Sequence, residues 1–179
     1  MLTKSQVEEA QKRAAYVLAG AGIALSATEP AQIEVADFGL GELDRTGLEV
    51  VVYVNTARVC AKEIVLFPGQ TCPEHLHPPF EGTPGKEETF RCRQGTVFLY
   101  VDGVRAARPV CQPPRPEHYT AWHEVVLGPG DQYTIPPQTR HWFQAPDGAV
   151  VSEFSTQSRD DLDVFTDPEI MRATLVKDS

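Results

Sequence analysis

The amino-acid sequence predicts a single, mainly β domain with one long helix at its N-terminus. The chain has 179 residues, a length typical of one domain. From about residue 33 onward, short runs rich in β-branched and aromatic residues alternate with turn residues, and the chain contains 15 Pro and 13 Gly. Runs of about 5 to 8 residues between such turns are typical of an all-β sandwich or barrel.

The first 25 residues carry the long helical pattern, and we expect a helix over about residues 5–20. Ser5 and Glu8 have the spacing of a capping box, in which each side chain bonds the other residue's backbone N–H. Apolar or small residues recur with the helical period at Val7, Ala10, Ala14, Val17 and Leu18. The helix should therefore pack one face against the β domain.

The β domain is expected over about residues 33–155, with turn signals such as Asp102-Gly103 between its strands. Residues 112–116 contain three prolines, so we predict an exposed connection there. In the C-terminal segment, residues 156–179, Asp167 followed by Pro168 and Glu169 resembles a helix N-terminus. This pattern predicts a short helix over about Pro168–Leu175.

Composition excludes several classes of partner. The net charge is −9 and no basic run occurs, so neither a nucleic acid nor an anionic membrane surface is an expected partner. No stretch approaches the ~20 apolar residues of a membrane span, and no signal peptide is evident, so we expect a cytoplasmic protein. Four cysteines lack C-x-x-C spacing and are expected to be reduced and mostly buried: Cys60, Cys72, Cys92 and Cys111.

Histidine and glutamate side chains indicate a metal site. His75 and His77 are two residues apart, so on a strand both imidazoles point to the same face. From Glu88 onward the chain alternates, with Phe90 and Cys92 on the same face as Glu88 and polar residues on the other. This alternation selects Glu88, and not Glu87, as the inward carboxylate.

A third histidine follows a glycine turn, a short strand and a proline corner, which together place His141 and Phe143 on one face of a strand. Three imidazoles and one carboxylate suit a divalent Mn, Fe, Co, Ni or Zn ion, with positions left open for water or substrate. His118 and His123 join no such set, and we interpret them as hydrogen-bonded core residues.

The motifs that carry these ligands resemble those of the cupins. The matching motifs are Gly69-x5-His75-x-His77, Glu88-x6-Gly95 and Gly130-x5-Pro136-x4-His141, which lie within about residues 48–155. The resemblance implies a jelly-roll-like β-barrel in which His75, His77, Glu88 and His141 hold a metal. The chain departs from the usual motifs at Gln138 and Ala145, and ten residues separate His77 from Glu88 where most cupins have three or four. An inserted loop beside the metal can rebuild the pocket.

This longer gap makes the chain similar to the D-lyxose isomerase family of cupins, from about Ile33 to Ile170. The resemblance is carried by the runs Val35–Gly41, Val52–Thr56, Cys72–His75, Lys86–Phe90 and His141–Gln144. It implies a manganese-dependent aldose–ketose isomerase that acts on D-lyxose and D-xylulose, often also on D-mannose and D-fructose. It further implies a small-molecule sugar as substrate and a homodimer.

An aldose–ketose isomerase needs a general base within ~3 Å of the proton that moves between C2 and C1. Glu153 is the first candidate, because it shares strand parity with Val151 and follows the His141 strand. Val150 and Phe154 could equally define the core face, which would turn Glu153 outward. Lys86 is the second candidate, as a donor to a sugar hydroxyl, although a loop lysine is more often simply solvated.

Three other functions fit the same ligand set. A sugar-phosphate isomerase would need a phosphate pocket, which Arg140, Lys86 and Thr83 could partly supply. An Fe(II)-dependent oxygenase could use the same four ligands, with open sites for O₂. A non-catalytic sugar-binding cupin has no need of the complete ligand set, so that set favours an enzyme.

Overall fold

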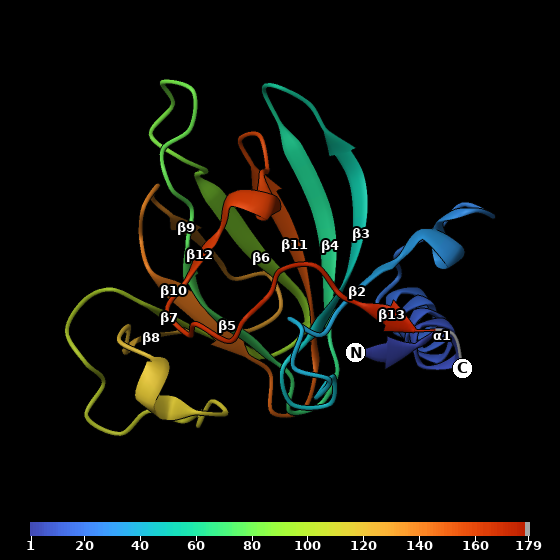
Figure 1. The fold of residues 1–179 in the computed structure, drawn as a ribbon, viewed down its shortest axis with the longest axis horizontal. Helices are drawn as coiled ribbons and strands as arrows, with labels where there is room; N and C mark the ends of the chain where they lie inside the picture. The colour runs from blue at the N-terminus through green and yellow to red at the C-terminus, as the bar shows by residue number, and fades with distance from the viewer. Residues whose placement is uncertain (178–179) are drawn as a thin grey trace.

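The computed structural model describes residues 1–177, whose strands form two facing antiparallel sheets with one long helix outside them. Figure 1 shows the two sheets in the body of the molecule and α1 (Lys4–Gly20) beside the outer strands β2, β3 and β4. Within residues 1–177 no ladder joins the two sheets, so they form an open jelly-roll-like sandwich rather than a closed cylinder. The predicted mainly β architecture is confirmed.

Within the described part of the chain, a small two-stranded sheet accompanies the two large sheets. The six-stranded sheet has the spatial order β2 (Glu34–Ala36), β3 (Leu48–Asn55), β4 (Cys60–Leu66), β11 (Ala149–Ser155), β6 (Glu88–Gly95), β9 (Gln132–Ile135). The five-stranded sheet has the order β12 (Val164–Phe165), β5 (Thr71–Leu76), β10 (His141–Gln144), β7 (Val97–Val101), β8 (His123–Leu127). A parallel pair, β1 (Leu2–Thr3) and β13 (Val176–Lys177), joins the two ends of the chain. Short 3₁₀ turns lie at Glu29–Gln32, Pro116–His118 and Asp160–Leu162.

The core lies between the two large sheets, and strand alternation decides which side chains reach it. On β6, Glu88, Phe90 and Cys92 are buried while Thr89 and Arg91 are only half-buried, as the sequence predicts. Apolar side chains from both sheets fill most of the space between them. The few inward polar residues are therefore held in an apolar frame, where each needs a partner.

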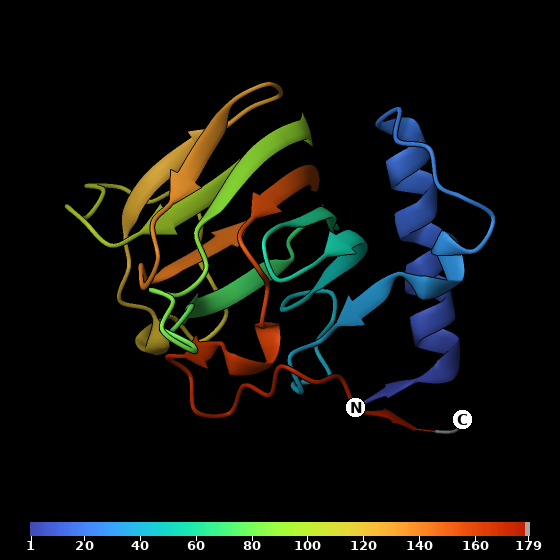
Figure 2. The same cartoon turned by 90° about the horizontal axis from the view of Figure 1, so that it is seen from above.

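Helix α1 packs on the outer face of the six-stranded sheet, as the view in Figure 2 shows. Its buried Ala14 and Leu18 contact a second apolar cluster that includes Val51 and Val65. The capping box is formed by Thr3 and Gln6, which exchange backbone-to-side-chain bonds of 2.8 and 3.2 Å. The expected box at Ser5 and Glu8 is therefore wrong, because the N-cap is Thr3, two residues before Ser5, and the helix begins at Lys4.

The predicted C-terminal helix is absent from the structure. Residues 168–175 form turns and irregular chain within the C-terminal strap, the name used here for residues 156–175. Tertiary contacts override the local signal, because Ile170 packs against the core and the Met171 N–H donates to the Phe38 carbonyl at 3.0 Å. Residues 178–179 of the expected C-terminal segment lie outside the described residues.

Three further expectations concern the cysteines, the proline-rich connection and membranes. The four cysteines, Cys60, Cys72, Cys92 and Cys111, are all free and buried, as expected. The proline-rich residues 112–116 lie in the connection between β7 and β8, where Pro113 is buried and its neighbours are half-buried or exposed. Among the described helices, none combines the length and apolar character needed to cross a bilayer.

Glu49 is a buried carboxyl on β3, in the layer beneath α1, far from the inward face of the sheet. Its Oε1 accepts a hydrogen bond of 3.2 Å from the Gln70 side-chain amide, and its Oε2 has no hydrogen-bond partner. Burial raises the pKa of Glu49 to about 8 from 4.5, against the opposing effect of the Gln70 hydrogen bond. Because the folded state binds this proton more tightly, folding is favoured at low pH and loses stability as pH rises from about 4.5 to 8.

We predict that Glu49→Gln loses less stability than the wild type between pH 6 and pH 9, because the amide has no proton to release. Between these pH values the free energy of unfolding should fall by at least about 1 to 2 kcal/mol more in the wild type than in the variant, as a pKa shift of about one unit or more implies. Urea unfolding at both pH values measures it. Glu42→Gln, at an exposed glutamate, is the control and should follow the wild type; identical pH profiles for Glu49→Gln and wild type would contradict the prediction.

Candidate active site

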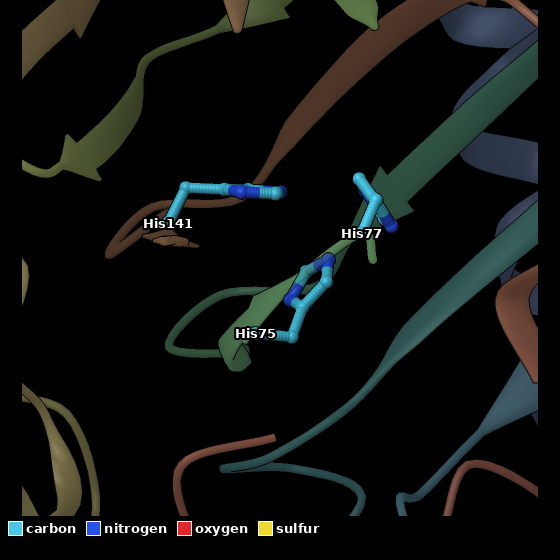
Figure 3. Close-up of side chains that lie close together, drawn as sticks. All are labelled: His75, His77 and His141. Atoms are coloured by element: carbon cyan, nitrogen blue, oxygen red, sulfur yellow. The ribbon is translucent and has the colours of Figure 1, made fainter. Parts of the chain in front are cut away.

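Three imidazole rings converge at one end of the space between the sheets. His75 is on β5, His77 follows the end of that strand, and His141 begins β10. Figure 3 shows the three rings gathered around one point. One ring nitrogen from each lies within 4.8 Å of the others, and all three side chains are buried. His75 pairs directly with His141 across the β5–β10 ladder, which brings these two side chains together.

The outer ring nitrogens fix the tautomers of two of these histidines. His75 Nδ1 lies 2.8 Å from the Pro73 carbonyl oxygen, and His141 Nδ1 lies 2.9 Å from that of Thr139. A carbonyl oxygen can only accept, so both Nδ1 atoms donate, and in the neutral form of each ring Nε2 presents its lone pair to the cluster. His77 Nδ1 is held at 2.6 Å by the carboxylate of Asp163. Such outward bonds are typical of metal-ligating histidines.

Glu88 reaches this cluster from the opposite sheet. Its Oε1 lies 2.9 Å from His141 Nε2 and 3.2 Å from His77 Nε2. The His141 Nε2 atom is buried and has no hydrogen-bond partner, although the carboxylate oxygen is so close. A divalent cation held by both atoms would satisfy them together, because imidazole nitrogen and carboxylate oxygen are both metal donors. The four predicted ligands therefore fit a divalent metal ion, with nitrogen and oxygen donors suited to Mn, Fe, Co, Ni or Zn.

Burial and neighbouring charge set the protonation of these groups. Burial, with the adjacent imidazoles of His141 and His77, holds the pKa of His75 well below its usual value, so His75 is neutral. Against burial, Lys86 and His77 hold the pKa of Glu88 well below its usual value, so Glu88 is a carboxylate. Against burial, the Glu88 carboxylate and the hydrogen bond to Asp163 raise the pKa of His77 to about 9, so a metal that binds at His77 would displace its proton.

Lys86 and Glu153 complete the polar lining of the same space. Glu153 is 4% exposed and shares the inward face of β11 with Val151, whereas Phe154 is 50% exposed. Of the two orientations that the sequence allows, the structure therefore has the inward one. Lys86 Nζ lies 2.6 Å from Glu88 Oε2 and 2.8 Å from Glu153 Oε1, so it bridges the two glutamates. It is buried, not solvated.

Three residues that the sequence analysis did not single out extend this network. Lys62 on β4 lies 3.7 Å from Glu153, and it contacts Asp160 of the C-terminal strap at 2.8 Å. Asp163, also in the strap, holds His77. Lys62 has the same strand parity as the buried Ile64, a signal that could have identified it. Asp160 and Asp163 lie on or beside a short 3₁₀ turn in a largely irregular segment, where no periodicity points to them.

The charged side chains form one connected network of ion pairs. Its carboxylates are Glu34, Glu88, Glu153, Asp160 and Asp163, and its basic groups are Lys62, His77, Lys86 and Arg172. Against burial, Glu153, Glu88 and Asp160 hold the pKa of Lys86 well above its usual value, so this lysine stays protonated.

Other candidates from the sequence lie outside this network. Arg140 is largely exposed and pairs with Asp102 at 3.3 Å, so it does not join Lys86 and Thr83 in a phosphate pocket. His118 is half-buried and His123 is exposed, so the expectation that they are core residues is wrong. Their neighbours are surface groups, such as the Val104 carbonyl at 3.1 Å from His123 Nδ1.

Comparison with known proteins places the chain in one family. It is 58% identical over 181 residues to the D-lyxose/D-mannose isomerase of Thermosediminibacter oceani, covering 99% of this chain and all of that one. It is 59% identical to the D-lyxose ketol-isomerase of Cohnella laeviribosi, covering 94% of each chain. The chain belongs to the D-lyxose isomerase family. The resemblance read from the cupin motifs and the longer His77–Glu88 gap is therefore confirmed, although no family model matches the chain.

The fold is shared more widely than the sequence. The L-ribose isomerase of Cellulomonas parahominis superposes with a TM-score of 0.82 over 98% of both chains, at 15% identity. The expected cupin-type fold with an N-terminal helix is confirmed by this likeness. The same fold therefore occurs in a protein whose sequence is only 15% identical to this chain.

We predict that His141→Ala lowers bound divalent metal from about one equivalent to near zero, because it removes one donor of a buried set. Elemental analysis after dialysis against Mn²⁺ measures the metal content. His123→Ala, at an exposed histidine outside the cluster, is the matched control and should bind metal like the wild type. Full metal content in His141→Ala would exclude it as a ligand.

Proposed function

We propose that this protein is a metal-dependent aldose–ketose isomerase that interconverts D-lyxose with D-xylulose and D-mannose with D-fructose. The observation that carries the proposal is the presence, in one buried space, of a three-histidine, one-glutamate donor set and a separate inward carboxylate, Glu153. Membership of the D-lyxose isomerase family supports the same substrates.

His75, His77, Glu88 and His141 would hold the ion, which we propose to be Mn²⁺. A bound divalent ion supplies Lewis-acid stabilisation of the negative charge that develops on the sugar oxygens. Co²⁺, Ni²⁺, Fe²⁺ and Zn²⁺ also suit these donors. We further propose that the protein acts in the cytoplasm as a homodimer, as the family resemblance implies.

Glu153 is the proposed general base. It would take the proton from C2 of the open-chain aldose and return it to C1, and the reverse reaction would follow the same path. The two buried lysines, Lys62 at 3.7 Å and Lys86 at 2.8 Å, surround its Oε1 with positive charge. Ser155 Oγ donates to the same oxygen at 3.1 Å, which leaves Oε2 for the substrate.

Lys86 has a different role in this proposal. Because its ammonium group stays protonated between Glu88 and Glu153, it can donate hydrogen bonds but cannot remove a proton. It would donate to a substrate oxygen beside C1 or C2 and keep the two glutamates apart. Asp163 and the Thr139 carbonyl would hold the imidazoles of His77 and His141 in place.

An assay of the Mn²⁺-loaded protein with free and phosphorylated sugars tests the function. We expect ketose formation from D-lyxose and D-mannose. We expect little from their phosphates, because Arg140 pairs with Asp102 and so does not contribute to a phosphate pocket. Turnover confined to the phosphates would instead assign a sugar-phosphate isomerase. Oxygen consumption without ketose formation would assign an oxygenase.

We predict that Glu153→Gln lowers kcat on the order of 10² to 10⁴ fold, because an amide cannot accept the C2 proton. Metal content should remain that of the wild type. The matched control is Glu63→Gln, at a buried glutamate on β4 whose carboxylate faces the other side of the sheet and accepts from Ser152. Steady-state kinetics with D-lyxose measure both variants, and normal turnover in Glu153→Gln would remove it from this role.

A further inference from the structure

The ten-residue segment between His77 and Glu88 contains a small hairpin beside the donor set. Phe80 and Thr83 exchange backbone hydrogen bonds of 3.2 and 2.8 Å. Between them Glu81 and Gly82 both have positive φ, at 45° and 79°, which is the backbone of a tight type I′ turn. We call residues 78–85 the insert hairpin. Its tight turn makes it a defined wall rather than a loose loop.

The insert hairpin and the C-terminal strap face each other across a pocket of about 360 Å³, which we call the outer pocket. The Arg159 guanidinium of the strap lies 4.3 Å from the centre of the Phe80 ring, so a cation–π contact links the two segments. The turn between β3 and β4 supplies Ala57 and Arg58 to the same pocket. Pro137, between β9 and β10, adds a fourth segment to the lining, so four separate segments define the size of the pocket.

The outer pocket adjoins a much smaller space around the proposed catalytic groups. This inner cavity has about 50 Å³ and is lined by residues that include His75, Glu88 and Glu153. Three residues, His77, Lys86 and Asp163, line both spaces, so the two meet beside the donor set. Pockets for small molecules usually have about 300 to 1,000 Å³. The inner cavity is too small for a whole sugar, whereas the outer pocket is large enough.

The lining of the outer pocket suits a polyhydroxylated chain. Phe80, Pro84 and Leu162 offer apolar surface to C–H groups, while Arg58 and Gln157 offer hydrogen-bond donors to hydroxyls. A ligand site of this kind combines mainly apolar walls with a few polar groups that fix orientation.

We propose that the outer pocket binds the end of the aldose remote from its carbonyl, and that its free depth sets the preference between five- and six-carbon sugars. The inference rests on the proposed function, because C1 and C2 must reach Glu153 in the inner cavity. The remaining carbons then extend past Lys86 and Asp163 toward Phe80. A hexose places one more carbon in the outer pocket than a pentose does.

Filling the outer pocket from its exposed rim tests this assignment. Ala57→Phe adds a ring at a solvent-exposed position of the β3–β4 turn, where folding should be little affected. We expect kcat/KM for D-mannose, relative to that for D-lyxose, to fall on the order of tenfold or more. Val59→Phe, on the same turn but outside the pocket lining, is the matched control and should keep the wild-type ratio within about twofold.

A second pair of variants removes part of the wall instead. Phe80→Ala should raise KM for both sugars on the order of tenfold with little change in kcat, because the reacting end of the substrate is unaffected. Phe80→Tyr keeps the ring and should restore KM. An unchanged mannose-to-lyxose ratio in Ala57→Phe, together with an unchanged KM in Phe80→Ala, would overturn the assignment. The wild type separates this outcome from failure of the proposed function. If the proposed function is wrong, the wild type itself converts neither sugar.

Discussion

The convergence of three imidazoles and one carboxylate on one buried point is the constraint on which the rest of the structure depends. The Nε2 lone pairs of His75 and His141 and the carboxylate of Glu88 converge from two sheets, with apolar side chains behind them. Such a set is unfavourable in a low-dielectric interior unless a cation neutralises it. Each partner of these groups follows from that requirement. The Pro73 and Thr139 carbonyls fix the tautomers, and the strand register brings His75 and His141 opposite each other.

The same requirement accounts for the two irregular segments that close this end of the sandwich. The C-terminal strap contributes Asp163 to His77 and Asp160 to Lys62, so a stretch with little regular structure completes the charge network. Lys86 directly follows the insert hairpin, and its ammonium group lies between two glutamates. The sheets thus hold His75, Glu88, His141 and the proposed base Glu153, while the irregular segments hold Lys86 and most of the wall of the outer pocket. Substrate preference can then vary without disturbing the donor set.

The sequence predicted the parts of this arrangement that follow from local geometry. Strand alternation selected Glu88 over Glu87, because one face of β6 is apolar. The inward or outward orientation of Glu153 stayed open, since apolar residues occur at both parities of β11 and the difference lies in what covers Val150. The expected helix at residues 168–175 failed because contacts with the core outweigh a capping signal. Asp160 and Asp163 could not be found, because their partners are distant in sequence.

The central claim is that a divalent ion at this donor set and a proton carried by the protein together perform the isomerisation. Its most direct test is NMR of D-lyxose in D₂O with protein stripped by a chelator, before and after Mn²⁺ is restored. The account predicts no conversion by the stripped protein, and xylulose carrying solvent deuterium at C1 after Mn²⁺ is added. Equal conversion before and after Mn²⁺ would contradict the role of the metal site. Conversion without any deuterium would contradict a base that exchanges its proton with solvent.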